Sequence, residues 1–278
     1  MNNILITGAA GFIGKNLATY LELRGFHVTK FDKKLGDSGF PNVCEQDHVI
    51  HLAANSSTTE KDLSKIIREN FCYSVELFKQ CKSLGVYFQY ASSASVYGAA
   101  KTFSEKDFCK PLSPYAYSKY MFDSWLQTET YPTQGFRYFN VYGQGEDEKG
   151  DQASPISKFI KQAKEKGEIT LFKNSDKSKR DFVHIDDVCE AHYRMLNKQC
   201  SGVFNVGTGE AISFKDVADA VKNKFNCKIK EIPMPKELTG QYQKFTKADN
   251  TKLISEIGEM DWKSVNSYIE EYENVCFN

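Results

Sequence analysis

The sequence has no excess of charge of either sign. Lysine and arginine together number 36 among the 278 residues, and aspartate and glutamate also number 36. No run of cations along the chain is long enough to follow a phosphate backbone. This balance argues against nucleic acid as a partner.

Long hydrophobic runs are also missing. No apolar stretch approaches the roughly 20 residues that a membrane-spanning helix needs. The opening residues, MNNILITGAAGFIG, lack the basic start and the cleavage site of a signal peptide. We therefore expect a cytoplasmic protein with no membrane partner.

The paired motifs of disulfide and metal sites are absent as well. The 8 cysteines contain no CxxC pair, and the 5 histidines show no ligand spacing. The cysteines are therefore interpreted as reduced packing residues, and we expect no bound metal.

The first feature that is present is a strand, a glycine turn and a helix. Residues 3–7 read NILIT, a short run of β-branched residues and leucine after Asn3. A stretch with helical spacing follows the turn and ends near Gly25. Glycines in such a turn permit a sharp bend, the close approach of a pyrophosphate and tight packing of the helix on the strand. An ordinary strand-to-helix turn can look the same. The predicted cofactor contacts here are Gly8, Gly11, Phe12, Ile13 and Gly14.

An acid stands at the end of the next predicted strand. Residues 27–32 read HVTKFD, and Asp32 lies 18 residues beyond Gly14, close to the spacing at which an acid meets an adenosine ribose. Asp32 favours NAD by accepting a hydrogen bond from the ribose 2′-hydroxyl. Lys33 and Lys34 favour NADP, because they could neutralise a 2′-phosphate. The choice between NAD and NADP stays open.

Two more predicted strands place small residues at their carboxyl ends, where cofactors bind in parallel sheets. Residues 49–52 end in Leu52, before Ala53 and Ala54, and residues 86–91 precede Ser92 and Ser93. The connection 33–46 is too short for a full crossover. The sequence therefore predicts an α/β fold with a doubly wound parallel Rossmann sheet whose edge is shortened after the second strand.

A tyrosine and a lysine share one face of a predicted helix. In PLSPYAYSKYMFDSWL, residues 111–126, Tyr115 and Lys119 are at positions i and i+4. An ammonium beside a phenol, together with a positive nicotinamide ring, stabilises the phenolate and lowers the phenol pKa from its ordinary value near ~10. Ser93 can hydrogen-bond the same substrate oxygen. A surface ring and a solvated amine would also show this spacing, but the glycine turn and the upstream serine favour catalysis.

These motifs together resemble the extended short-chain dehydrogenase/reductase family, whose members act mainly on nucleotide sugars. Longer segments are similar to one branch of that family, the ADP-glycero-manno-heptose 6-epimerases, and the resemblance runs over nearly the whole chain. The general motifs are TGAAGFIG (7–14), HLAA (51–54), SSASVYG (92–98) and Tyr115 with Lys119, and the more specific ones include SSTTE (56–60), KGDQAS (149–154) and GQYQKFTKAD (240–249).

This resemblance implies an epimerase that uses one tightly bound NAD or NADP per subunit. A hydride leaves C6 of the heptose, a transient ketone forms, and the hydride returns to the opposite face. The implied proton handlers are Tyr115 and Lys149. Lys119 holds the nicotinamide ribose, Ser93 the reacting oxygen, and Asn70 lies on the cofactor side.

The resemblance also implies a substrate site and an assembly. Arg180 suits a bidentate grip on a diphosphate. The chain departs from the family at Asn55, where a cysteine is usual, and at Asp151 and Lys158, where serine and histidine are usual. Family members suggest a homo-oligomer. The implied substrate contacts are Ser57, Asn140, Val141, Phe172, Ser175, Arg180 and Tyr242.

Two interleaved domains are expected. Residues 1–143 and 181–207 would form the NAD(P)-binding Rossmann domain, and residues 144–180 and 208–278 a smaller α/β substrate-binding lobe.

Three rival functions stay open. The fold and the catalytic residues also fit a UDP-hexose 4-epimerase, although Lys149 then has no evident task. A dTDP-glucose 4,6-dehydratase needs acids beside the active serine, and residues 93–95 supply none. A non-catalytic dinucleotide sensor would not need the serine, tyrosine and lysine.

Overall fold

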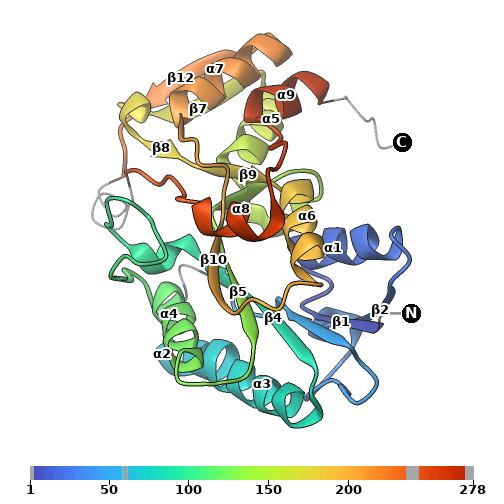
Figure 1. Cartoon of the computed structure of the whole chain (residues 1–278). Coiled ribbons are helices and arrows are strands. Elements are labelled where there is room, and N and C mark those ends of the chain that lie inside the picture. The colour runs from blue at the N-terminus through green and yellow to red at the C-terminus, as the bar shows by residue number, and fades with distance from the viewer. Residues whose placement is uncertain (1–2, 58–59, 61, 236–243, 273–278) are drawn as a thin grey trace.

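The central feature of the computed structural model, which describes residues 3–57, 60, 62–235 and 244–272, is a six-stranded parallel sheet (Figure 1). Its strand order is β10-β5-β4-β3-β1-β2, and every neighbouring pair is parallel. The predicted fold class is thus confirmed. The strands are β1 (Asn3–Thr7), β2 (His27–Phe31), β3 (His48–His51), β4 (Tyr87–Ser93), β5 (Thr133–Tyr138) and β10 (Gly202–Val206).

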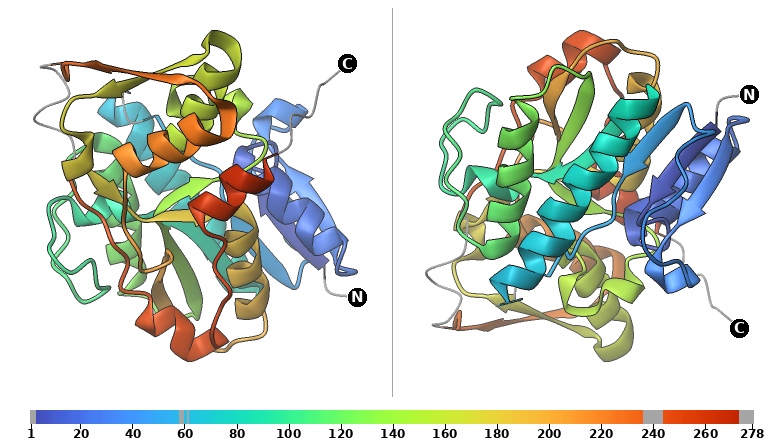
Figure 2. Two further views of the ribbon diagram at one scale, coloured as in Figure 1. Left: turned by 90° about the horizontal axis from the view of Figure 1, so that it is seen from above. Right: turned by 90° about the horizontal axis from the view of Figure 1, so that it is seen from below.

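Helices cover both faces of this sheet, and this explains why the inner strands are apolar along their length. Helices α1 (Phe12–Glu22) and α6 (Ile185–Met195) share one core with the sheet, whereas α3 (Tyr73–Leu84) and α4 (Pro114–Leu126) share another. The two views in Figure 2 show the sheet between these layers. In β1, Ile4 and Ile6 belong to the first core and Leu5 to the second, as expected for alternating side chains.

The sheet edge is shortened as predicted. Between β2 and β3, residues 32–47 form no strand and contain only the 3₁₀ turn η1 (Lys33–Leu35). β2 therefore remains the edge strand beside β1.

A π-helical turn interrupts the helical segment that precedes β4. The segment runs from α2 (Leu63–Ile66) through η2 (Ile67–Cys72) into α3. Such π turns are frequent at functional sites, and this one contains the buried Asn70.

Strand β5 ends at Tyr138, where the backbone hydrogen bonds change partner. Phe139 donates its backbone N–H to the Val206 carbonyl, and Asn140 donates to Asp181 instead. The next strand, β6 (Asn140–Tyr142), consequently leaves the main sheet and pairs with β9 (Phe182–His184).

A third hydrophobic core lies in the other lobe. It is formed by the parallel pair β7 (Glu168–Phe172) and β12 (Lys228–Ile232) and by helices α5 (Pro155–Lys166), α7 (Phe214–Phe225) and α9 (Val265–Glu271). Helix α5 buries residues 156, 159, 160 and 163, the spacing of one helical face. Ser154 caps its start by accepting from Ser157 N, and Gly167 ends it in a left-handed conformation. The short pair β8 (Lys179–Arg180) and β11 (Ile212–Ser213) adjoins this lobe.

One segment of the predicted second lobe packs elsewhere. The apolar face of α8 (Thr251–Ile257), with Leu253 and Ile257 one turn apart, joins the first core together with Met260. Helix α8 thus covers β10 and α6, although residues 208–278 were assigned to the second lobe. Within the described part of the chain, no helix is long and apolar enough to cross a membrane.

Candidate active site

The glycine turn between β1 and α1 packs directly on the end of β3. Gly8 has a φ of +74°, and a Cβ there would lie 2.6 Å from Ala53 N. A Cβ on Gly14 would lie 2.2 Å from the Gly8 carbonyl oxygen. Larger residues at either position would force the turn apart, so the close packing predicted for these glycines is present.

The start of α1 suits an anionic group. Gly11 is its N-cap residue, provides no side-chain cap, and is followed by no acid in the first turn. The backbone N–H groups of a helix start, with the positive end of the helix dipole, favour phosphate oxygens. The turn therefore fits the dinucleotide pyrophosphate, and Gly8, Gly11, Phe12, Ile13 and Gly14 lie where such a group would be held.

Asp32 reaches back from the end of β2 to this turn. Its carboxylate accepts from Ala10 N at 3.1 Å and from Lys34 N at 2.8 Å. The acid that was predicted to meet a ribose thus also braces the glycine turn. The Lys33 side chain is 82% exposed, with its Nζ 4.0 Å from the Glu69 carboxylate, so it extends toward η2.

Asn70 braces the loop after β3, which carries Leu52, Ala53 and Ala54. Its Oδ1 accepts from Asn55 N at 2.7 Å, and its Nδ2 donates to Asn55 O and to Ser118 Oγ, each at 3.0 Å. Asn70 is buried, and its amide joins this loop to α4. Asn70 is thus enclosed, and it holds the loop that carries the predicted cofactor contacts.

The predicted serine, tyrosine and lysine meet at the carboxyl end of β4. Ser93 hydrogen-bonds the Tyr115 phenol and accepts from Ser95 Oγ at 2.9 Å. Lys119 lies one turn further along α4, is buried, and donates from Nζ to the Ala91 carbonyl at 2.8 Å. Helix α4 is fixed here because Ser113 caps it and Pro114 follows.

The protonation of this cluster differs in one respect from the prediction. Burial raises the pKa of the Tyr115 phenol, the hydrogen bond from Ser93 lowers it, and the Asp123 carboxylate raises it. Burial also lowers the pKa of the Lys119 ammonium to about 8, whereas Asp123 favours its charged form. Desolvation is therefore the largest influence on the Tyr115 pKa among the chain's own residues, and the interaction that lowers this pKa is the hydrogen bond with Ser93, not the charge of Lys119 that was expected to do so.

A buried acid connects α4 with the two central strands. Asp123 accepts from Ser92 Oγ at 3.0 Å, from Tyr90 Oη at 3.1 Å and from Arg137 Nε at 2.9 Å. Arg137 also donates to Tyr97 Oη at 3.0 Å. Because Ser92 precedes Ser93 and Asp123 follows Lys119 by one turn, these bonds hold the two halves of the cluster together.

Lys149 lies at the glycine turn. Its Nζ is 4.7 Å from the centre of the Phe12 ring and 3.3 Å from Glu146 Oε2. The same loop contacts the β3 loop, where Ser56 Oγ donates to Gln152 Oε1 at 3.2 Å. The charged loop over residues 143–154 thus borders the predicted cofactor site, although its sequence resembles an ordinary surface loop.

The predicted substrate contacts that the structure describes are spread over four places. Ser57 is in the loop after β3. Asn140 and Val141 are in β6, and because the Val141 side chain is packed in the first core, Val141 presents mainly its backbone. Ser175 Oγ donates to the Phe172 carbonyl at the end of β7. Arg180 is 7% exposed, with its guanidinium 5.5 Å from the Phe214 ring centre. Tyr242 lies outside the described residues.

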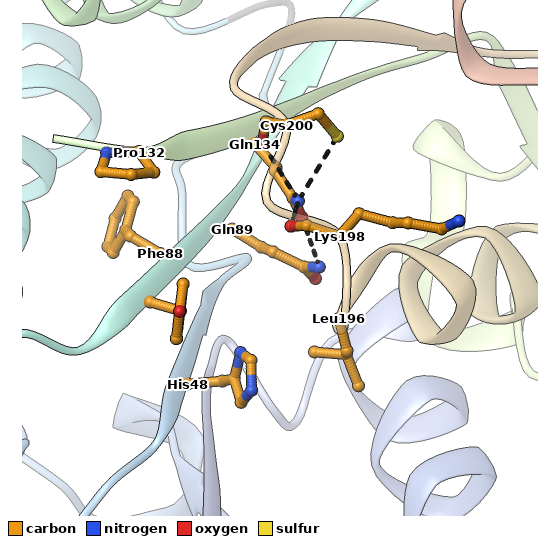
Figure 3. A pocket seen from close by; sticks show the side chains of 9 residues that line it. His48, Phe88, Gln89, Pro132, Gln134, Leu196, Lys198 and Cys200 are labelled. Carbon is orange, nitrogen blue, oxygen red and sulfur yellow. Dashed lines mark hydrogen bonds between the residues drawn. The ribbon is translucent and has the colours of Figure 1, made fainter. Parts of the chain in front are cut away.

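A small cavity lies at the amino-terminal ends of the strands, away from the catalytic cluster, and is too small for a substrate. It encloses about 10 Å³ between the starts of β3, β4 and β5 and the connection from α6 to β10 (Figure 3). Gln134 Nε2 donates there to the Lys198 carbonyl at 2.8 Å, and Gln89 Nε2 donates to Gln134 Oε1 at 2.9 Å. That volume holds about one water molecule.

Three residues of the site were not predicted: Asp123, Arg137 and Glu146. A signal existed for Asp123, because it continues the i, i+4 spacing of Tyr115 and Lys119 on one helix face. Arg137 lies in a strand and Glu146 in a loop rich in acids, so neither showed a pattern that separates it from its neighbours.

The comparison with known proteins agrees with this geometry. The NAD dependent epimerase/dehydratase family matches residues 4–207, which contain the glycine turn, the cluster on α4 and the Lys149 loop. The chain belongs to this family. Membership confirms the expected class of enzyme and its nicotinamide dinucleotide cofactor.

Individual proteins are similar to this chain over nearly its whole length. The ADP-L-glycero-D-manno-heptose-6-epimerase of Alkalilimnicola ehrlichii is 35% identical over 97% of this chain and 96% of its own. The crystal structure of the Helicobacter pylori ADP-L-glycero-D-manno-heptose-6-epimerase is 28% identical, with a TM-score of 0.85 over 98% of this chain and 94% of that one. A Thermotoga maritima UDP-glucose 4-epimerase is 25% identical, with a TM-score of 0.83 over 96% of each chain.

Proposed function

We propose that this family member inverts C6 of ADP-glycero-manno-heptose. The observation that carries the proposal is the position of Lys149, which borders the glycine turn while Tyr115 and Ser93 lie at the end of β4. An inversion needs a proton handler for each face of the reacting carbon. The similarity to two heptose 6-epimerases along nearly the whole chain supports the same substrate.

The chain's residues have separate tasks in this proposal. When bound, the dinucleotide supplies a nicotinamide that accepts the hydride of C6 and returns it. Ser93 hydrogen-bonds the C6 oxygen, and Tyr115 exchanges the proton of that oxygen in one epimer. Lys149 exchanges it in the other epimer, and Lys119 holds the nicotinamide ribose.

The cofactor contacts and the substrate contacts are proposed on opposite sides of these groups. Asp32 and the glycine turn hold the adenosine half of the dinucleotide, while Arg180, 7% exposed, binds the substrate diphosphate. The lobe of residues 144–180 and 208–278, without α8, carries the substrate. Cytoplasmic location and homo-oligomeric assembly stay predictions, which cell fractionation and light scattering check.

The substrate is tested by offering purified protein two candidates. We expect interconversion of the two C6 epimers of ADP-glycero-manno-heptose, followed by NMR, and no conversion of UDP-glucose to UDP-galactose. Conversion of UDP-glucose alone would instead support the 4-epimerase alternative, which the Thermotoga maritima neighbour favours. Conversion of neither, with dinucleotide bound, would favour the sensor.

A further inference from the structure

Glu146 is a buried carboxylate at the base of the Lys149 loop. Its side chain is 1% exposed. Oε1 accepts from Gly143 N at 3.2 Å and from Ser154 Oγ at 2.7 Å, and Oε2 accepts from Ser154 N at 2.6 Å. One carboxylate therefore joins the two ends of residues 143–154.

Burying a carboxylate is costly unless its charge is compensated. The three donors from Gly143 and Ser154 are neutral. The Lys149 ammonium supplies a compensating charge, with its Nζ 3.3 Å from Oε2. The pair is asymmetric, because the Lys149 side chain remains 29% exposed while Glu146 is enclosed. The carboxylate is thus the fixed partner and the ammonium the accessible one.

The closed loop also rests against the start of α1. A Cβ on Gly145 would lie 3.9 Å from both Phe12 Cδ2 and Asn16 Nδ2, and Gly145 has a φ of +91°. The Lys149 ammonium lies over the same Phe12 ring at 4.7 Å. A displacement of the loop would therefore move the ammonium relative to the start of α1, which borders the predicted cofactor site.

We propose that Glu146 is a positioning residue, which closes residues 143–154 and holds the Lys149 ammonium, the proposed second proton handler, over the Phe12 ring at the start of α1. This inference rests on the proposed role of Lys149. It assigns to the buried Glu146 a task that is separate from chemistry, since Glu146 is enclosed and reaches the reaction only through Lys149.

The first test is Glu146→Gln, which preserves size and removes the charge. We expect kcat for heptose epimerisation to fall by about 10- to 100-fold, because misplacing a reacting group by about 1 Å costs up to that much. KM should stay within about 3-fold, since no substrate contact is removed. Glu165→Gln, which breaks an exposed pair with Lys161, is the matched control and should leave kcat unchanged.

A second measurement excludes a merely stabilising role. In a Lys149→Ala background, Glu146→Gln should lower kcat by less than about 2-fold, because the group it positions is gone. Equal fold-losses in both backgrounds would overturn the inference. Hydrogen exchange in residues 143–154 should be faster in Glu146→Gln than in the Glu165→Gln control, and unchanged exchange would also overturn it.

Two outcomes separate this inference from the proposed function. A Lys149→Ala variant with the wild-type rate would remove the role of Lys149 and this inference with it. A slow Lys149→Ala variant beside a fully active Glu146→Gln variant would overturn this inference alone. If Glu146→Gln does not fold, Glu146→Asp keeps the charge but withdraws it by one methylene, and an undiminished kcat in that variant would contradict the positioning role.

Discussion

At the scale of single residues, the contact between Ser93 and Tyr115 is the centre of the account. Burial raises the pKa of the phenol, and the serine hydrogen bond is the local interaction that favours its ionised form. We expect Tyr115→Phe to lower kcat by about 100- to 10,000-fold, the usual contribution of a general acid or base. Steady-state kinetics and thermal unfolding check this. An active variant, or one whose Tm collapses, would contradict it.

Asp32 gives a second prediction at this scale. Asp32→Ala removes the acceptor of Ala10 N and Lys34 N, and the loss of such a brace costs about 1–2 kcal/mol. We expect copurified dinucleotide, measured by mass spectrometry, to fall at least 10-fold. Asp37→Ala is the control, because the Asp37 carboxylate accepts from Asp32 N, whereas Ala10 N and Lys34 N donate to Asp32. Equal retention in both variants would contradict a cofactor role for Asp32.

Single residues were predictable where chemistry and spacing coincide. Tyr115, Lys119 and Ser93 could be predicted as catalytic because a tyrosine and a lysine one helical turn apart, with a serine upstream, suit proton transfer beside a nicotinamide. Glu146 could not be distinguished from the neighbouring acids, since only the fold brings Gly143 and Ser154 to the same carboxylate. The role of Asn70 as a brace likewise depends on Asn55 and Ser118, which are remote in sequence.

At the scale of elements, the Asp123–Arg137 pair joins α4 to β5, and Asp123 also binds β4 through Tyr90 and Ser92. Both charges are almost fully buried, at 3% and 1% exposure. We expect Asp123→Ala to cost about 3–5 kcal/mol of unfolding free energy, because it leaves a buried guanidinium uncompensated. Urea unfolding measures this.

The matched control is the neutral double variant Asp123→Leu/Arg137→Met. It should lose less stability than Asp123→Ala, since no charge remains buried. If the loss of unfolding free energy in the double variant equals the sum of the losses in the two single variants, the two side chains act independently, which would contradict the pairing.

Elements were predictable where periodicity decides them. Helices α5 and α7 each bury residues at i, i+3, i+4 and i+7, and a capping serine marks the start of each. The break between β5 and β6 was not predictable, because it is set by the partners of Phe139 and Asn140. The position of α8 depends on its contact with β10 and α6, which the sequence of that helix does not encode by itself.

At the scale of the whole molecule, two enclosed histidines make stability depend on pH. Burial lowers the pKa of His192 to about 3 and, with the charge of Lys119, that of His51 to about 3. An unfolded histidine has a pKa near ~6.5. Between these values the unfolded chain binds more protons, so stability is lost as the pH falls from about 6.5.

His192→Gln isolates this effect. Its stability deficit against the wild type should shrink by about 2 kcal/mol between pH 7 and pH 5, as measured by urea unfolding. Burial raises the pKa of Asp187 to about 6, so this carboxyl group makes stability rise as the pH falls, opposite to the histidines. Asp187 is present in both the wild type and the variant, so the difference in stability between these two proteins is the readout. A deficit that is constant with pH would contradict a neutral buried His192.

The central claim is that C6 is inverted by removal and return of the same hydride. The most direct measurement uses ADP-glycero-manno-heptose with deuterium at C6, incubated with the purified protein in ordinary water and followed by NMR and mass spectrometry. We predict a mixture of both C6 epimers that retains the deuterium at C6. Epimerisation with loss of deuterium to water, or no epimerisation at C6, would contradict the account.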